Sequence, residues 1–519
     1  MGPRLTTPDQ NRHLRIDHLA ATIGRRAVRG GVIMLVAQSV KIAAQFAAIV
    51  ILARLLPPRA FGLIAMVAAV NMCFDYIKEL GLSAATIRKS DISHEQVTAL
   101  FWINAGAGAL IAAALFLIAP LVARFYNEPD LVGVTRILAL AFVLNGLTVQ
   151  HWALLRRQMR FVATAALATG GDLGGLATAV AVALAGGGYW ALVAQRLVGP
   201  VLILIGSWAL CHWRPGRPRR APDLRELLGF GGAFTLAGVA VAFTRSIDQI
   251  LIGWLWGPSS LGYYERASKL ALTPVDNINA PVYSVAMPAL SRIVHEPERY
   301  RQGFGAMMER TAMLVLPGGL LAASCANVVV STLFGHGWSP AAPLVAFFAL
   351  ASASVPLAMA SYLLPITQNR SRDLVRATVI DSGLCLALIV AGLPFGVPAV
   401  AASYGAGSFL VRTPLVFWLV TRRGAVSASD IWRAIVPSLF AGASVAIAVR
   451  LFEMAWPAKT LTPAAHLAVL CFVGAAVALT AFAIVPRSRR NLIALLTPVM
   501  RFLGARPQVM AHHPDGSRG

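Results

Sequence analysis

Two stretches of the sequence, 31–79 and 231–279, carry ionisable side chains inside long apolar runs. The charged residues well inside these runs are Lys41, Asp75, Arg245, Asp248, Glu265, Arg266, Lys269 and Asp276. An ionisable group inside a membrane-length segment is costly unless it faces a bundle interior or water. The two stretches therefore predict an internal polar site that the rest of the chain must position.

Four of these cations are expected to share one water-filled cleft. Lys41 and Arg245 lie near the middle of corresponding apolar runs, and Arg266 and Lys269 are three residues apart on one helix face. Several Arg and Lys donors in a partly dehydrated site match a pyrophosphate group well. We therefore predict that Lys41, Arg245, Arg266 and Lys269 bind an anionic headgroup.

The acidic residues and the cations near the span ends have secondary predicted roles. Candidates for a gate or a coupling site are Asp248, Glu265, Asp276 and Asp381, and the predicted outer mouth contains Arg54 and Arg59. Asp248 is three residues after Arg245, and Glu265 is four before Lys269, so each is placed to neutralise a cation. The alternative reading is that the charges only form ion pairs that hold helices together, and an Asp381–Arg412 pair is its plainest instance.

The sequence contains no arrangement of residues that indicates catalysis, a metal or a cofactor. P-loop and GxSxG motifs are absent, and the five cysteines show neither a CxxC motif nor zinc-ligand spacing. Six tryptophans near span ends are expected to lie in the membrane interface: Trp190, Trp208, Trp213, Trp254, Trp256 and Trp338. We expect neither an enzyme nor a cofactor-binding protein.

Composition identifies the class of protein. Of the 519 residues, 57% are hydrophobic and only 13% are charged, whereas soluble proteins carry about 25% charged residues. Apolar runs of membrane-spanning length recur along almost the whole chain. The prediction is an all-α polytopic membrane protein with about 14 transmembrane helices.

The net charge of +23 does not indicate a nucleic-acid partner, because most Lys and Arg residues lie in short loops between the apolar runs. They fall on alternate loops together with both ends of the chain. By the positive-inside rule, both termini are then expected in the cytoplasm of a multi-pass protein of the cell inner membrane.

An internal repeat at an offset of 200 residues predicts the domain organisation. Leu55, Pro58 and Gly62 recur as Leu255, Pro258 and Gly262. An even number of spans between the repeats predicts two six-helix lobes inserted in the same sense, with a cleft between them. The expected division is a cytoplasmic tail (1–30), an N-lobe (31–211), a linker (212–228), a C-lobe (229–420), an extra hairpin (432–486) and a second tail (487–519).

Two segments of the sequence carry a family resemblance. They are Ile51–Met66, which includes Pro57, Pro58, Phe61 and Gly62, and Leu80–Arg88. The sequence resembles Wzx-type polysaccharide flippases, of the colanic-acid-exporter branch of the multidrug/oligosaccharidyl-lipid/polysaccharide exporter superfamily. The Asp248–Tyr264 region is also similar to that branch. The resemblance implies a two-lobed fold with a cationic cavity, to which Lys41, Arg245, Arg266 and Lys269 are assigned by position.

The activity that the resemblance implies is the transfer of an undecaprenyl-pyrophosphate-linked oligosaccharide from the cytoplasmic to the periplasmic leaflet by alternating access. The expected partners are the lipid-linked oligosaccharide, membrane lipids, and a polymerase and chain-length regulator of the same pathway. Two alternatives remain open from the sequence. One is a membrane glycosyltransferase or polymerase, which would need catalytic residues in sizeable outer loops; the other is a drug-efflux antiporter, which a positive cleft disfavours.

Overall fold

The computed structural model describes most of the chain. The described residues are 23–79, 86, 92–217, 224–456, 462–485, 488, 489 and 491. Within these ranges the structure does not describe the side chains at 23–37, 73, 75–79, 224–245 and 278–281. Asp75 and Arg245 are among them.

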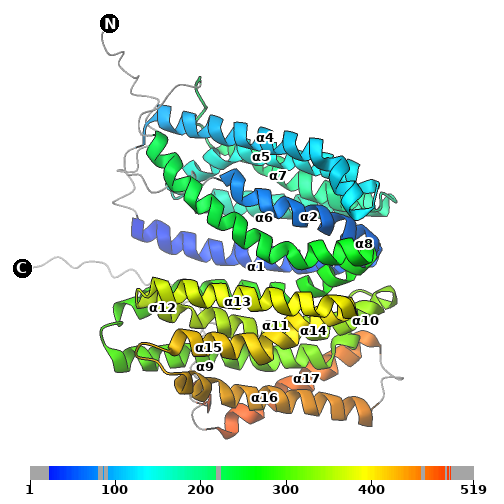
Figure 1. Ribbon diagram of the computed structural model, residues 1–519, viewed down its shortest axis with the longest axis vertical. Helices are drawn as coiled ribbons and strands as arrows, with labels where there is room; N and C mark the ends of the chain where they lie inside the picture. The colour runs from blue at the N-terminus through cyan, green and yellow to red at the C-terminus, as the bar shows by residue number, and fades with distance from the viewer. Residues whose placement is uncertain are drawn as a thin grey trace, which may run out of the picture. The chain divides into compact units, whose positions relative to one another are not determined.

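Every regular element among the described residues is helical (Figure 1). The longer helices are α1 (Ile23–Leu55), α2 (Pro58–Glu79), α4 (His94–Tyr126), α5 (Asp130–Arg157), α6 (Phe161–Leu184), α7 (Trp190–Leu210), α8 (Leu224–Arg292), α9 (Pro297–Ser324), α11 (Ala342–Ser361), α13 (Ser371–Gly392), α14 (Val397–Gly407), α16 (Ala428–Ala455) and α17 (Pro463–Ile484). The shorter ones are α10 (Ala326–Leu333), η2 (His336–Ala341), α12 (Leu363–Thr367), η3 (Leu393–Phe395), η4 (Ser408–Arg412) and α15 (Thr413–Thr421). The predicted all-α class is confirmed.

Nine helical segments of the described chain are long and apolar enough to cross a membrane, or ten if α9 and α10 count as one span. Those two helices are bent by 76° at Cys325. The protein is therefore a polytopic membrane protein, and the number fourteen stays a prediction. The 69-residue α8 is broken at Gly257, whose φ of 76° and ψ of −179° are not helical. A glycine is favoured there because positive φ is strained for other residues.

The described residues form two compact units. Unit 1 draws on Met1–Asn277, Ala326–Phe348 and Ser382–Tyr404, and unit 2 on Ile278–Cys325, Ala349–Asp381 and Gly405–Gly519. Unit 1 thus takes helices from both sides of the predicted linker at 212–228. The predicted division into lobes, hairpin and tails stays a prediction.

Close helix crossings in unit 1 depend on glycine. A Cβ on Gly108 of α4 would lie 2.5 Å from the Phe142 carbonyl oxygen of α5, and one on Gly146 of α5 would lie 2.6 Å from that of Asn104. Small residues let helix backbones approach in this way inside a membrane, where apolar burial does not drive association. Ser93 begins α4 with a capping box, and Asn127 ends it in the left-handed conformation.

The two copies of the sequence repeat meet inside unit 1. A Cβ on Gly62 would overlap the Pro258 carbonyl group, and a Cβ on Gly262 would overlap the carbonyl group of Pro58. Each copy therefore places its glycine against the proline of the other. We call these four residues the Pro58 crossing.

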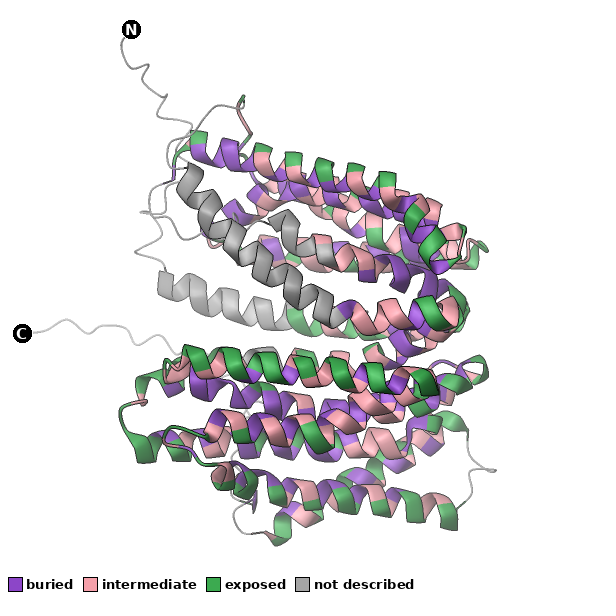
Figure 2. Cartoon of the chain, in the orientation of Figure 1, coloured by how far each residue is buried: buried purple, intermediate pink, exposed green. Residues whose placement is uncertain are grey.

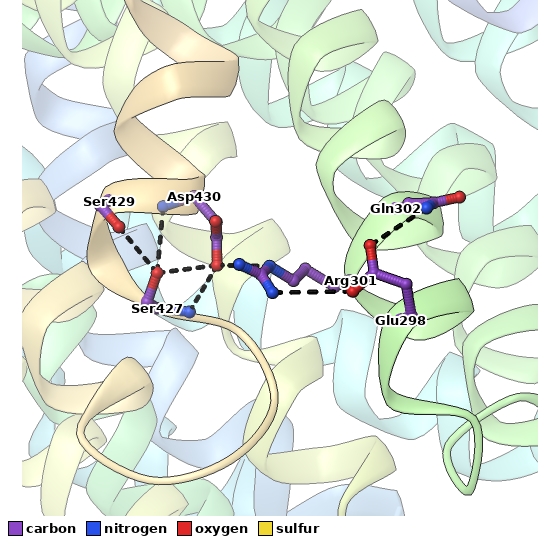
Figure 3. A network of polar contacts seen from close by, with 6 residues as sticks. All are labelled: Glu298, Arg301, Gln302, Ser427, Ser429 and Asp430. Atoms are coloured by element: carbon purple, nitrogen blue, oxygen red, sulfur yellow. Dashed lines mark hydrogen bonds and ion pairs between the residues drawn. The ribbon is translucent and has the colours of Figure 1, made fainter.

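In unit 2, α16 packs along α9 and beside α17. Ser427 and Asp430 form a capping box at the start of α16. The Nε of Arg301, on α9, donates to the Asp430 carboxylate at 3.0 Å (Figure 3). This contact ties the first helix of the predicted extra hairpin to α9.

Exposed positions run along much of the length of α13 and α16, and are not confined to their ends (Figure 2). Several are large and apolar, including Val379 on α13 and Phe440 and Leu451 on α16. In water such faces would be unfavourable, whereas a membrane surrounds helices with hydrocarbon. The exposed faces therefore agree with a membrane setting.

Candidate functional site

A cluster of charged side chains lies on the second half of α8 and on α7 of unit 1. Glu265 is buried, and its two carboxylate oxygens accept from Nε of Arg266 at 2.6 Å and from a terminal nitrogen of Arg266 at 3.0 Å. The Nζ of Lys269 lies 3.6 Å from the same carboxylate. The expected Glu265–Lys269 pair is therefore present. The closer partner of Glu265 is Arg266, which the i,i+4 spacing does not reveal.

Arg196 of α7 adds a third cation to this group. It acts electrostatically on both Glu265 and Lys269 and is exposed. We call Arg196, Glu265, Arg266 and Lys269 the α8 charge cluster; with three cations and one carboxylate it has a net charge of +2. The predicted site omits Arg196. A charge inside the sixth apolar run was its only signal in the sequence, and that signal does not specify which helix it faces.

The cations of this cluster differ in how accessible they are. The side chain of Lys269 is 50% exposed, whereas those of Arg266 and Glu265 are 13% and 8% exposed. The guanidinium carbon of Arg266 lies 4.3 Å from the centroid of the Phe61 ring. The cluster therefore combines one accessible ammonium with one guanidinium held between a carboxylate and an aromatic face. It presents guanidinium and ammonium donors of the kind that form charge-assisted hydrogen bonds with phosphate oxygens.

Lys41 lies on α1, in unit 1. Its Nζ is 4.0 Å from an Asp172 oxygen on α6, with the two side chains 37% and 42% exposed. Gln38, one turn earlier on α1, donates to Asn277 of α8 at 3.3 Å. Counting residues from this contact along two antiparallel helices places Lys41 about 8 Å from Lys269 in the axial direction. Lys41 therefore lies on a helix that contacts α8 through Gln38, and its own partner is the acid Asp172.

The acid expected to neutralise Arg245 has another contact. Asp248 accepts a hydrogen bond of 2.8 Å from the Tyr264 hydroxyl group. The Arg245 side chain lies outside the described residues, so its predicted place in the site stays a prediction. Asp276 is exposed on α8, next to Asn277.

The two cations predicted at the outer mouth both bind protein groups. Arg54 donates to the carbonyl oxygens of Thr332 and Leu333, at the C-terminus of α10, the second at 2.9 Å. Arg59 lies 2.7 Å from Glu128 and 3.5 Å from Asp130. Both side chains therefore have protein partners, at the end of unit 1 that holds the Pro58 crossing.

One expected interfacial tryptophan also proves to be buried at this end. Trp338 is only 3% exposed, and its Nε1 donates to the Ala53 carbonyl oxygen at 2.8 Å. Trp213, which follows the C-terminus of α7, is likewise buried. Both rings are packed inside the protein and their indole N–H groups have protein partners, so neither faces lipid. Their depth relative to the membrane interface stays a prediction.

Asp381 belongs to unit 2 and is paired. The Nε of Arg412 and one of its terminal nitrogens donate to the two Asp381 oxygens at 2.9 and 3.1 Å, and its other terminal nitrogen donates to Ser408. Arg412 ends η4, a π-helical turn. The pair is the plainer alternative that the sequence offers for Asp381. Within the described residues, moreover, no group of three or more His, Cys, Asp or Glu is arranged to hold a metal ion.

Comparison with known families gives one match over more than half of the chain. The family described as "Polysaccharide biosynthesis protein" matches residues 51–343. The matched region contains the Pro58 crossing, the α8 charge cluster and Arg54.

Curated proteins are similar over part of their length. The chain is 25% identical over 301 residues to "Lipopolysaccharide biosynthesis protein WzxC" of Escherichia coli, covering 57% of this chain and 60% of that one. It is 29% identical over 284 residues to "Teichuronic acid biosynthesis protein TuaB" of Bacillus subtilis (53% and 57% covered). It is 28% identical over 309 residues to "Succinoglycan biosynthesis transport protein ExoT" of Rhizobium meliloti (59% and 62% covered). The similarity thus spans about three-fifths of each relative.

Two solved structures have a similar fold. "Lipid II flippase MurJ, inward closed conformation" aligns with a TM-score of 0.71 at 12% identity, covering 89% of this chain and all of that one. An inward-facing multidrug resistance transporter of the MATE family aligns with a TM-score of 0.55 at 13% identity, covering 76% of this chain and 96% of that one. These alignments show that the chain has the fold of these membrane transporters.

Proposed function

We propose that this chain, which belongs to the polysaccharide biosynthesis protein family, moves a lipid-linked oligosaccharide across the membrane. The proposed substrate is an oligosaccharide repeat unit on undecaprenyl pyrophosphate, carried from the cytoplasmic to the periplasmic leaflet by alternating access. The observation that carries the proposal is the α8 charge cluster, in which Arg266 and Lys269 of α8 contact one buried carboxylate and Arg196 of α7 acts on it electrostatically.

The chemistry of this cluster suits a pyrophosphate group. A pyrophosphate presents several strong acceptor oxygens, and guanidinium groups bind such oxygens with two parallel hydrogen bonds. Arg266 and Lys269 supply donors from one helix, and Arg196 supplies donors from another. Lys41 and Arg245 complete the set that the sequence predicts.

The setting of the chain is proposed together with its function. We propose that both termini lie in the cytoplasm and that the membrane is the cell inner membrane, because the basic residues concentrate in alternate loops together with both ends of the chain. A polymerase and a chain-length regulator of the same pathway would receive the flipped repeat unit. The names of WzxC, TuaB and ExoT, which refer to lipopolysaccharide, teichuronic acid or succinoglycan biosynthesis, support a role in a pathway of this kind.

Replacement of Arg266 by Ala tests the proposal. Loss of a charge-assisted contact to a phosphate costs about 1.5–3 kcal/mol, so affinity for a polyprenyl pyrophosphate is expected to fall roughly 10- to 100-fold. In cells that depend on this chain for export, lipid-linked repeat unit should accumulate on the cytoplasmic face. Arg299→Ala is the matched control, because Arg299 is 70% exposed and paired only locally with Glu296.

Normal export by Arg266→Ala at wild-type protein levels, together with unchanged binding of the pyrophosphate, would refute the proposal. A drug-efflux antiporter of cations is disfavoured by the net charge of the cluster, since its substrate would be repelled there. A glycosyltransferase would be recognised by formation of a glycosidic bond by the purified protein.

A further inference from the structure

The Pro58 crossing is one of three contacts that join the first repeat to the second at the same end of unit 1. The second is the pair of hydrogen bonds from Arg54 to the C-terminus of α10. The third is the hydrogen bond from Trp338 to Ala53. We call these three contacts the Pro58 closure. In alternating access, such a closure must separate when the site opens at this end of the protein.

The glycines make the Pro58 crossing an all-or-none contact. Backbone touches backbone at both Gly62 and Gly262, and both residues are buried. No flexible side chain lies between the two repeats there to absorb a small displacement. Packed contacts of this kind switch between discrete arrangements and do not deform gradually.

Phe61 touches both the Pro58 closure and the α8 charge cluster. Its ring is 2% exposed and makes an edge-to-face contact with Trp338, with 5.5 Å between ring centroids. The other contact is the Arg266 guanidinium group, 4.3 Å from the ring centroid. Phe61 also directly precedes Gly62 in the chain.

We propose that Phe61 couples anion binding at Arg266 to opening of the Pro58 closure. This inference rests on the proposed function, because it requires a pyrophosphate at the α8 charge cluster. A phosphate that takes over the N–H groups of Arg266 draws the guanidinium away from the Phe61 ring. The Phe61 ring then loses its contact with the Arg266 guanidinium and becomes free to move. Once the ring moves, it no longer packs against Trp338 or fixes the position of the adjacent Gly62.

The test measures how fast a cysteine inside the Pro58 closure reacts with a maleimide. Ala53→Cys is a suitable reporter, because Ala53 is 2% exposed; it is placed in a full-length chain whose five native cysteines are replaced by serine. The probe is farnesyl pyrophosphate, with farnesol as its uncharged control, and the protein is purified in detergent. Binding is followed separately by intrinsic tryptophan fluorescence.

Farnesyl pyrophosphate is expected to raise the rate of labelling about fivefold or more in the parent protein. The rate follows the fraction of molecules in which the Pro58 closure is open, and the probe is expected to increase that fraction. In Phe61→Leu the probe should still bind, but adding the probe should not raise the labelling rate of that variant. Leucine is the residue of the second repeat at the equivalent position, Leu261, where it is fully buried. Phe61→Tyr keeps a ring and should restore the response.

The glycines supply a second, independent measurement. Gly62→Ala and Gly262→Ala should label quickly without any probe, because the added methyl group prevents the crossing. Gly106→Ala, whose Cβ would meet nothing within 4 Å, and Gly108→Ala, which crowds a crossing within the first repeat, should label as slowly as the parent. Equal labelling of Gly62→Ala and the parent would overturn the assignment of the closure.

The outcomes separate the inference from the proposed function. Binding that depends on Arg266 without any change in labelling, or with the same rise in Phe61→Leu, overturns the role of Phe61 and leaves the function standing. Absence of binding, or binding that Arg266→Ala leaves intact, overturns both.

Discussion

The ion pair between Asp381 and Arg412 gives a prediction that separates a structural role from a role in energy coupling. The two side chains are 11% and 14% exposed and share two hydrogen bonds, and Arg412 donates a third to Ser408. Replacing Asp381 by Asn removes the charge while keeping the size of the side chain. It leaves a largely buried guanidinium without its carboxylate.

Breaking a buried pair by removing one partner costs about 3–5 kcal/mol, whereas replacing both partners by apolar residues is often nearly neutral. Asp381→Asn is therefore expected to lower the melting temperature by roughly 6–20 °C. This range takes about 2–4 °C per kcal/mol, the value for a folded unit of about 150–250 residues such as unit 2. The double variant Asp381→Leu with Arg412→Met should recover most of that loss. Thermal unfolding in detergent, followed by fluorescence, measures all the variants together with the single replacements of each residue.

The exposed pair of Arg299 and Glu296 is the control, since the side chains are 70% and 50% exposed and such pairs contribute about 0–1 kcal/mol. A double variant no more stable than the worse single replacement would refute the structural role. A stable double variant that has lost export would instead support Asp381 as a coupling residue.

Two further predictions concern the α8 charge cluster and α16. Glu265→Gln removes the carboxylate that competes with an anion for Arg266, so affinity for pyrophosphate should rise about tenfold while the melting temperature falls. Unchanged affinity would contradict the proposal that a phosphate takes the place of Glu265 at Arg266. Asp430→Asn removes the nearer of the two carboxylates that pair with Arg301, the other being that of Glu298 (Figure 3). It should speed hydrogen exchange in the first turn of α16, whereas Arg433→Ala, an exposed replacement on the same helix, should not. Equal exchange in both variants would contradict the proposed anchor.

The class of protein and the repeat could be predicted from the sequence because both depend on local pattern. Membrane-length apolar runs need no tertiary information. The recurrence of Pro58 and Gly62 as Pro258 and Gly262 identifies equivalent positions, although not that they touch each other. The bend between α9 and α10 was not predicted, because apolar composition continues across Cys325.

The candidate site was predicted only in part, because a side chain has several destinations in a membrane helix. The spacing of Glu265 and Lys269 indicates their pairing, since residues four apart share a helix face. The direction of Arg196 and the contact of Phe61 with Arg266 depend on how α7, α2 and α8 pack. Trp338 shows the same ambiguity, because a tryptophan near a span end suits an interface and a buried hydrogen bond equally well.

The buried Glu265 explains how a cluster of cations can exist in a membrane without a permanent ligand. Three cations without a counterion would repel one another and destabilise α7 and α8 whenever the proposed substrate is absent. Glu265 pairs with Arg266 and Lys269 in that state. A phosphate that takes over Arg266 leaves the carboxylate with Lys269 and Arg196 as its remaining cations. The affinity for the substrate is then a difference between two sets of similar contacts, which keeps it moderate. The proposed transport requires that property, because a site that binds its substrate too strongly cannot release it on the other side of the membrane.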